Sequence, residues 1–107
     1  MLEVTKDTFE QEVLQSEQVV LVDWWGPKCE YCLELMPAME ELADKYRGKM
    51  KFCSVNVSGN RRLAIGYKVL GLPAMVFFKD GEKVDEISGS DITIEEIEEK
   101  IKLHAEQ

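Results

Sequence analysis

Residues 19–36, with the sequence VVLVDWWGPKCEYCLELM, decide the fold of this chain. The apolar, β-branched run Val19–Trp25 predicts a buried strand. Cys29 and Cys32 follow it, and apolar residues then recur with helical spacing as far as Tyr46. A strand that leads into a helix places Cys29 at the helix N-terminus, where unpaired N–H groups and the helix dipole favour a thiolate over a thiol. We therefore interpret the two cysteines as a reversible dithiol switch.

The same pair is compatible with two other roles, a zinc site and an inert pair of core residues. Zinc normally takes four ligands, and the sequence offers only Cys53 and His104 in addition, neither spaced like a second half-site. We interpret Cys53 as a small buried apolar residue, with a regulatory thiol as the alternative, and His104 as a surface residue at a helix end. Redox chemistry is favoured because a CxxC motif beside a strand–helix unit is typical of it. We expect no metal and no cofactor besides the redox-active disulfide.

Length, composition and charge bound the remaining possibilities. A chain of 107 residues with 45% hydrophobic content predicts a single domain over residues 1–107. The formal charge of −8 argues against nucleic acid and anionic membranes as partners, since both bind clustered Lys and Arg, and it favours proteins. The first residues lack a basic, apolar leader, and no segment reaches the roughly 18 apolar residues that span a bilayer, which predicts a cytoplasmic location. We expect a monomer.

Capping residues, turn signals and apolar periodicity predict the other elements. The first half contains a strand near Leu2–Val4, a helix capped by Thr8 with Gln11, and a helix after Cys29 that contains Pro37 and ends at Gly48. A strand over Lys51–Val57 and a helix over about 60–67 follow. The chain then forms strands over Met75–Lys79 and Lys83–Ser88 around an Asp80-Gly81 turn, and a last helix capped by Thr93 with Glu96. Alternating strands and helices imply parallel pairing, and the hairpin adds antiparallel strands. The predicted class is α/β, with a central mixed sheet flanked by helices on both faces.

The order of these features resembles the thioredoxin family over essentially the whole chain. The resemblance rests on Val22–Trp25 before the cysteine motif, Pro37 after it, Gly71–Ala74, Phe77–Gly81 and Gly89. It implies the thioredoxin fold and a thiol-disulfide oxidoreductase that reduces protein disulfides and acts as an electron carrier. Cys29 would attack the substrate disulfide and Cys32 would resolve the mixed disulfide. The implied partners are disulfide-containing proteins and a thioredoxin reductase.

Asp23 is the second candidate catalytic residue. A carboxylate buried in an apolar strand is costly, and desolvation raises its pKa toward the range in which it accepts a proton near neutral pH. The resemblance places it beneath Cys32 as the group that helps deprotonate that thiol. Without the resemblance, an exposed aspartate at the strand end is an equal alternative.

The resemblance also implies a surface that binds the substrate chain. In the family the bond before the matching proline is cis, and the preceding residue, here Leu72, offers its backbone to the substrate in a strand-like pairing. We expect Trp25 at a partly exposed rim, with core packing as the alternative, and Trp24 in the core. The candidate binding residues are Trp25, Lys28, Tyr31, Leu72, Pro73 and Gly89.

The active-site motif departs from the family pattern. Typical thioredoxins carry Gly-Pro between the cysteines and Trp before them, whereas this chain has Glu30, Tyr31 and Lys28. The tyrosine is shared with the Cys-Pro-Tyr-Cys motif of glutaredoxins, but nothing else favours a glutathione site. Glu30 disfavours a thiolate at Cys29 and Lys28 favours one, each by about 1 kcal/mol or less. Ser54 stands where the family usually has a lysine near the buried aspartate.

Three functions therefore remain open from the sequence. They are a general thiol-disulfide oxidoreductase, a dedicated electron carrier for one enzyme system, which the unusual motif would suit, and a binding module without enzymatic activity. Both cysteines together with Asp23 and Pro73 weigh against the last, because a module used only for binding needs none of that chemistry.

Overall fold

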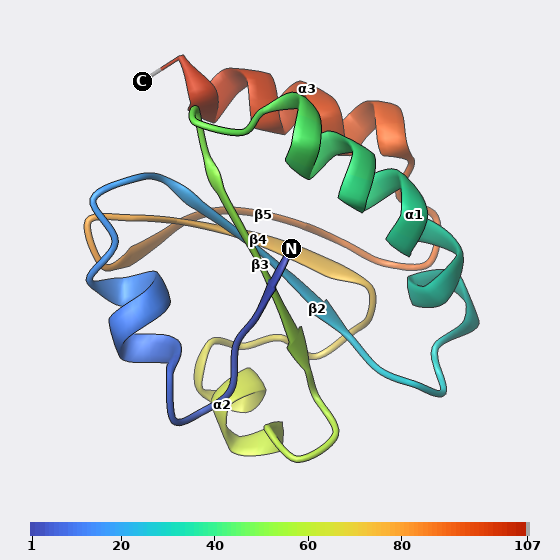
Figure 1. The fold of residues 1–107 in the computed structure, drawn as a ribbon. Coiled ribbons are helices and arrows are strands. Elements are labelled where there is room, and N and C mark those ends of the chain that lie inside the picture. Colours follow the sequence, from blue (N-terminus) through green and yellow to red (C-terminus); the bar gives the residue numbers. More distant parts are fainter. Residues whose placement is uncertain (107) are drawn as a thin grey trace.

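Five strands form one mixed sheet in the computed structural model, which describes residues 1–106 (Figure 1). The strands are β1 (Leu2–Glu3), β2 (Val20–Trp25), β3 (Lys51–Asn56), β4 (Ala74–Lys79) and β5 (Glu82–Ser88). Their order across the sheet is β1-β3-β2-β4-β5. β3 is parallel to β1 and β2, whereas β4 is antiparallel to β2 and β5. The predicted α/β class with a mixed sheet is confirmed.

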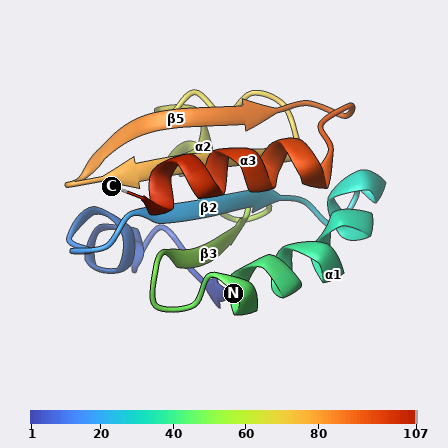
Figure 2. The same cartoon turned by 90° about the horizontal axis from the view of Figure 1, so that it is seen from above.

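Helices cover both faces of this sheet, as predicted. They are η1 (Glu10–Leu14), α1 (Glu30–Lys45), α2 (Arg61–Gly66) and α3 (Ile94–Ala105). Figures 1 and 2 show α1 and α3 side by side over one face, with η1 and α2 on the other. Within residues 1–106, no helix is both long enough and apolar enough to cross a membrane.

The central strand β2 is buried on both sides, which explains its continuous apolar run. Val20, Val22 and Trp24 face the core cluster under η1 and α2. Leu21, and Val19 just before the strand, face the cluster under α1 and α3. Because side chains alternate along a strand, Asp23 shares the orientation of Leu21 and lies on the face that α1 covers.

Local signals placed the hairpin and the last helix correctly. Asp80 and Gly81 both have positive φ, 52° and 81°, as expected of a two-residue turn that matches the twist of the flanking strands. The Thr93 side chain accepts the N–H of Glu96, and the Glu96 carboxylate accepts the N–H of Thr93, so the predicted capping box is confirmed. A register shift between Phe77 and Phe78 was not anticipated.

The prediction that Thr8 caps the first helix is wrong. The Thr8 hydroxyl instead accepts the N–H of Thr5 at 3.0 Å, and the Thr5 hydroxyl accepts the N–H of Asp7 at 3.2 Å. The chain therefore begins to turn at Thr5. The segment after it has π-type hydrogen bonding, with the N–H of Gln15 bonded to the carbonyl of Glu10 at 2.9 Å. The hydroxyl groups of Thr5 and Thr8 thus bond to nearby backbone N–H groups in place of the predicted cap.

The prediction that His104 lies on the surface is also wrong. His104 is only 7% exposed, and its ring stacks on Phe77 with centroids 4.8 Å apart. Its Nε2 lies 2.8 Å from a carboxylate oxygen of Asp85 on β5, and Lys100 donates to both oxygens of the same carboxylate. The reason is tertiary: α3 lays its last turn over the sheet, where Asp85 supplies the polar partner that a buried imidazole needs.

Candidate active site

Cys29 and Cys32 lie at the N-terminus of α1 and are joined by a disulfide, with Cα atoms 5.3 Å apart. Cys29 is the N-cap residue, in extended conformation, and its sulfur accepts the N–H of Cys32 at 3.2 Å. Cys29 is half-buried, whereas Cys32 is 2% exposed. The two sulfurs are therefore unequal: a molecule outside the protein can reach Cys29, and Cys32 is shielded behind it.

Asp23 is a buried carboxylate on β2, with 2% of its surface exposed. This excludes the alternative of an exposed aspartate at the strand end. Burial raises the pKa of Asp23 to about 7, and the negative charge of Glu40 on α1 adds to the rise. Asp23 thus titrates near neutral pH on the sheet face that α1 covers. Cys32, in the first turn of α1, is also buried.

Among the residues that the structure describes, no cation compensates the burial of Asp23. Its neighbour across the parallel register is Ser54 on β3, and across the antiparallel register Met75 on β4. Asp23 takes part in no ion pair with the residues that the structure describes. With serine where the family usually has lysine, burial acts on this carboxyl without a compensating positive charge.

The Leu72–Pro73 peptide bond is cis, as the resemblance implied. Pro73 is buried and Leu72 is half-buried. The N–H of Gly89 donates to the carbonyl of Pro73 at 3.0 Å, so two predicted binding residues are joined through the backbone. Gly89 has a φ of +117°, and a Cβ added there would lie 3.1 Å from a carboxylate oxygen of Asp91. This position accordingly favours glycine.

The aromatic residues around the motif occupy different environments. Trp25 is half-buried at the end of β2, which confirms a partly exposed position, and Trp24 is fully buried beside Phe9. Tyr31 is turned inward: its hydroxyl donates to the carbonyl of Ile92, just before α3, and its ring packs against the core under α1. The tyrosine thereby ties the first turn of α1 to the segment before α3. The sequence contained no signal for this bond.

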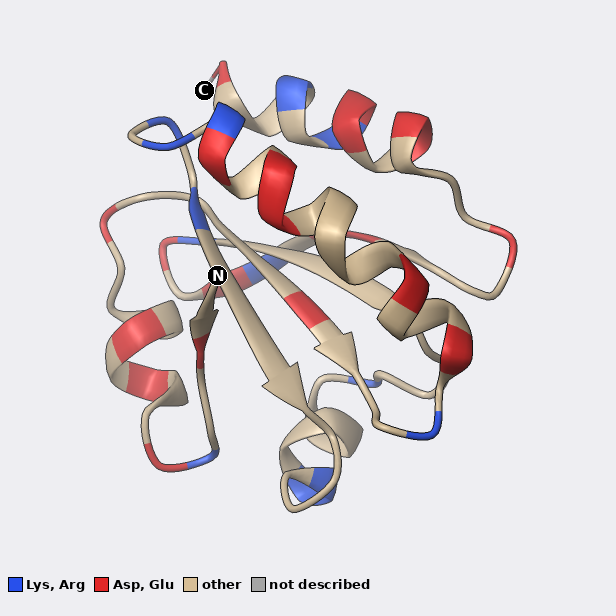
Figure 3. Cartoon of the chain, turned by 45° about the vertical axis from the view of Figure 1, so that its right-hand side comes forward, with Lys and Arg blue, Asp and Glu red and all other residues tan. Residues whose placement is uncertain are grey.

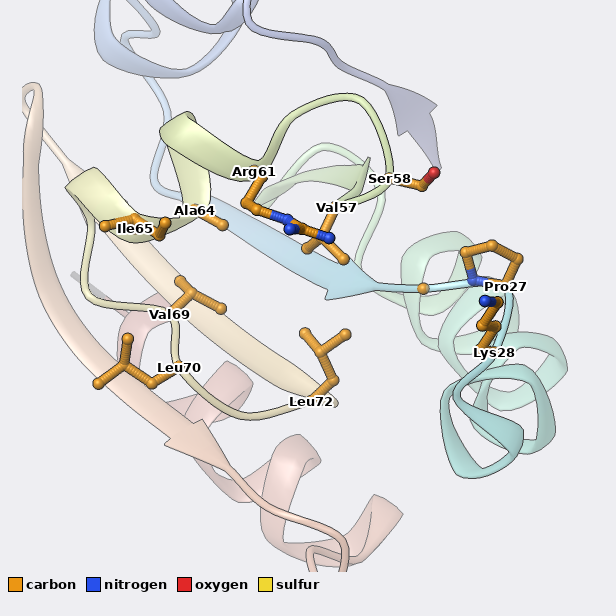
Figure 4. Close-up of a pocket in the computed structure, with 11 residues that line it drawn as sticks. Pro27, Lys28, Val57, Ser58, Arg61, Ala64, Ile65, Val69, Leu70 and Leu72 are labelled. Carbon is orange, nitrogen blue, oxygen red and sulfur yellow. The ribbon is translucent and has the colours of Figure 1, made fainter.

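A groove opens beside the cysteine motif, with a volume of about 380 Å³ (Figure 4). Its lining brings together Lys28 and Leu72, which the sequence had placed on the binding surface. It also contains residues that sequence reasoning missed, chiefly Arg61 at the start of α2 and the exposed side chains of Ile65 and Leu70. The other predicted binding residues, Trp25, Tyr31, Pro73 and Gly89, are not among the residues that line it.

The two further zinc ligands that the sequence offered, Cys53 and His104, are both buried in the structure. Cys53 is fully buried in β3, where burial raises the pKa of its thiol to about 11. His104 is paired with Asp85. Among residues 1–106, no group of three or more His, Cys, Asp and Glu side chains is arranged to hold a metal ion.

Comparison with known proteins identifies the family. The thioredoxin family model matches residues 1–103. A thioredoxin of Peptoclostridium acidaminophilum is 47% identical over 97% of this chain and 94% of its own length. A thioredoxin of Acetoanaerobium sticklandii is 45% identical over 97% and 99%, and thioredoxin 1 of a Nostoc species is 42% identical over 82% of each chain. With the mixed sheet, the Cys29–Cys32 pair at a helix N-terminus and the cis proline, the match leads to one conclusion: the chain belongs to the thioredoxin family.

Proposed function

We propose that this chain is a protein-disulfide reductase that works by dithiol–disulfide exchange through Cys29 and Cys32. One observation supports this most directly, namely the unequal exposure of two bonded cysteines at the N-terminus of α1. Exchange needs one sulfur that substrates can reach and a second that acts only after the first has reacted.

In the first step Cys29 attacks the substrate. The Cys29 thiolate forms a bond to one sulfur of the substrate disulfide, the substrate S–S bond breaks, and the other substrate sulfur leaves as a thiolate that takes up a proton. The position of Cys29 at the N-terminus of α1 supports this role, because the first-turn N–H groups and the helix dipole stabilise negative charge there.

In the second step Cys32 releases the product. Cys32 loses its proton and attacks the sulfur of Cys29, so that the Cys29–Cys32 bond forms and the second substrate sulfur leaves. Two electrons have then passed from the dithiol to the substrate. We assign the acceptance of the Cys32 proton to Asp23, since a carboxyl whose pKa burial raises to about 7 both takes up and releases protons near neutral pH.

The cycle requires a reductase that returns the disulfide to the dithiol. We propose a thioredoxin reductase for this step, disulfide-containing proteins as substrates, and electron transport in the cytoplasm by a monomer whose single domain spans residues 1–107. Trp25, Lys28, Tyr31, Leu72, Pro73 and Gly89 are proposed to form or support the surface that receives the substrate. The bound redox group is the Cys29–Cys32 disulfide itself.

Reduction of insulin disulfides tests the assignment of the two cysteines. With a small dithiol as electron source, we expect the Cys29→Ser variant to fall to the rate of the dithiol alone, because no other thiol is positioned to attack. When it is reduced first and the dithiol is then removed, Cys32→Ser should still attack insulin and accumulate mixed disulfides that separate on a non-reducing gel. Cys53→Ala is the matched control, and it should keep the parent rate because this thiol is buried away from the motif. Parent-level reduction by Cys29→Ser would overturn the proposal.

A further inference from the structure

The groove beside the cysteine motif combines an apolar floor with a charged edge. Its apolar lining is contributed by Val57, Ala64, Ile65, Val69, Leu70 and Leu72. Two of these side chains are unusually exposed for their type, Ile65 at 56% and Leu70 at 86%. Lys28, which directly precedes Cys29, forms one end of the lining, so a chain bound in the groove would extend from the reactive sulfur.

Both cations of this groove are free to bind a ligand. Lys28 and Arg61 are exposed, and neither forms an ion pair with any of the residues that the structure describes. In Figure 4 the side chain of Arg61 extends from α2 over Val57 toward the segment that contains Pro27 and Lys28. The chain as a whole carries a charge of −8, and Figure 3 shows acidic residues on α1, η1 and α3. Two cations that form no ion pair with the described residues thus line the groove that begins next to the reactive cysteine of an acidic protein.

We propose that this groove selects disulfide substrates whose chain carries an acidic side chain close to the attacked cysteine, with Lys28 and Arg61 binding its carboxylate and the apolar floor holding a neighbouring residue. This inference rests on the proposed function, because the groove matters only if Cys29 attacks a substrate chain. The selected class is an acidic peptide segment with an apolar residue next to it.

Charge complementarity supports this occupant over a neutral or basic chain. An exposed ion pair contributes about 0.2–1 kcal/mol, so two cations that contact one carboxylate change a binding ratio by about fivefold. Glu30, the acidic residue of the motif, is exposed but does not line the groove, so it does not neutralise the two cations from within. The overall negative charge repels an acidic peptide at long range, and selection must therefore come from the local cations.

Two synthetic disulfide peptides test the proposal. They differ only in a Glu or a Gln placed beside a leucine, two residues from the attacked cysteine. At low salt, we expect the reduced parent protein to react with the Glu peptide with a second-order rate constant about five times that for the Gln peptide. The ratio should approach one in the Lys28→Gln/Arg61→Gln variant, and it should fall in the parent at high salt. Each protein serves as its own reference, because only the ratio is compared.

Arg62→Gln/Lys49→Gln is the matched control. Arg62 and Lys49 are exposed and do not line the groove, so this variant has the same net-charge change as Lys28→Gln/Arg61→Gln and should keep the parent ratio. Equal rates for the two peptides with the parent protein, or a ratio that survives in the double variant, would overturn the inference while insulin reduction stands. Failure to reduce either peptide or insulin would instead overturn the proposed function.

Discussion

Burial separates the titratable residues of the core into reactive and inert ones. Asp23 and Cys53 lie on adjacent strands, since Cys53 is the register partner of Val22. The pKa of the Cys53 thiol is raised to about 11 by burial, so the thiol stays protonated at neutral pH and is unreactive. The prediction of a small buried apolar residue is confirmed. Burial also raises the pKa of Asp23 to about 7, so this carboxyl can take up and release a proton near neutral pH.

Asp23→Asn should stabilise the fold at high pH and slow catalysis. A raised folded-state pKa gives stability that is complete below the unfolded pKa of about 4 and is lost as pH rises to about 7, because the folded state then has to ionise a buried group. Asn avoids this loss but buries an amide, so we expect a net gain of roughly 1–3 kcal/mol at pH 8 and a much smaller gain at pH 4. Urea unfolding at both pH values measures the gain.

Asp7→Asn provides the control, because Asp7 is exposed near the start of the chain and its loss of charge should leave the pH profile unchanged. Insulin reduction by Asp23→Asn should be slower than by the parent, since Cys32 loses its proton acceptor. An Asp23→Asn protein with the parent's stability profile and the parent's rate would show that this carboxyl neither strains the fold nor transfers the proton.

At single residues, sequence reasoning succeeded where the partners are local and failed where they are distant. The spacing of Cys29 and Cys32 identified the site because both lie in one turn. The inward orientation of Tyr31 depends on the carbonyl of Ile92, far along the chain, and Arg61 reaches the groove only through the position of α2. No periodicity encodes such contacts. The burial of Asp23 was ambiguous from the strand pattern alone and needed the family resemblance to be favoured.

Among the elements, α3 depends most clearly on its cap. The capping box formed by Thr93 and Glu96 satisfies backbone N–H groups at the start of the helix. Ile97 and Ile101 then pack against the sheet face beneath α1 and α3. The carbonyl of Ile92, next to the cap, receives the hydroxyl of Tyr31, so the start of α3 is linked to the active-site turn. Loss of this cap would therefore loosen the start of α3 and the active-site turn together.

Thr93→Ala should destabilise the protein by about 1 kcal/mol, because the N–H of Glu96 loses its acceptor. Thr93→Ser keeps a hydroxyl at this position and should recover most of the loss. Urea midpoints of the parent and the two variants measure the effect at neutral pH. If the serine variant were as unstable as the alanine variant, the methyl group of Thr93 would be the stabilising feature and the cap would not.

Elements with strong local signals were predicted well, and those shaped by packing were not. The turn at Asp80 and Gly81 and the box at Thr93 are encoded within four residues, and both form as expected. The prediction for the start of the first helix failed because the two threonine hydroxyls bond elsewhere. The Thr8 hydroxyl accepts the N–H of Thr5, and the Thr5 hydroxyl accepts the N–H of Asp7. The bulge between Phe77 and Phe78 reflects how β5 fits β4, which a single strand pattern does not contain.

For the whole molecule, folding and redox state are linked by a thermodynamic cycle. The difference in unfolding free energy between the oxidised and reduced proteins equals the difference in disulfide stability between the folded and unfolded chains. A protein whose fold favours the disulfide gives up electrons readily and acts as a reductant. One whose fold favours the dithiol acts as an oxidant. A comparison of the unfolding free energies of the oxidised and reduced proteins therefore shows whether the Cys29–Cys32 pair acts as a reductant or as an oxidant.

We expect the oxidised protein to be more stable than the reduced one by about 1–2 kcal/mol. The disulfide closes a loop of about four residues. The lost chain entropy raises the free energy of the unfolded chain by about 2 kcal/mol, and the helix N-terminus offsets up to about 1 kcal/mol of this by stabilising a thiolate in the reduced form. Urea unfolding followed by circular dichroism, with and without dithiothreitol, measures the gap. The Cys29→Ser/Cys32→Ser variant should not respond to the reductant. A reduced form more stable than the oxidised form would indicate a fold that favours the dithiol, and the chain would then be an oxidant of protein thiols rather than a reductase.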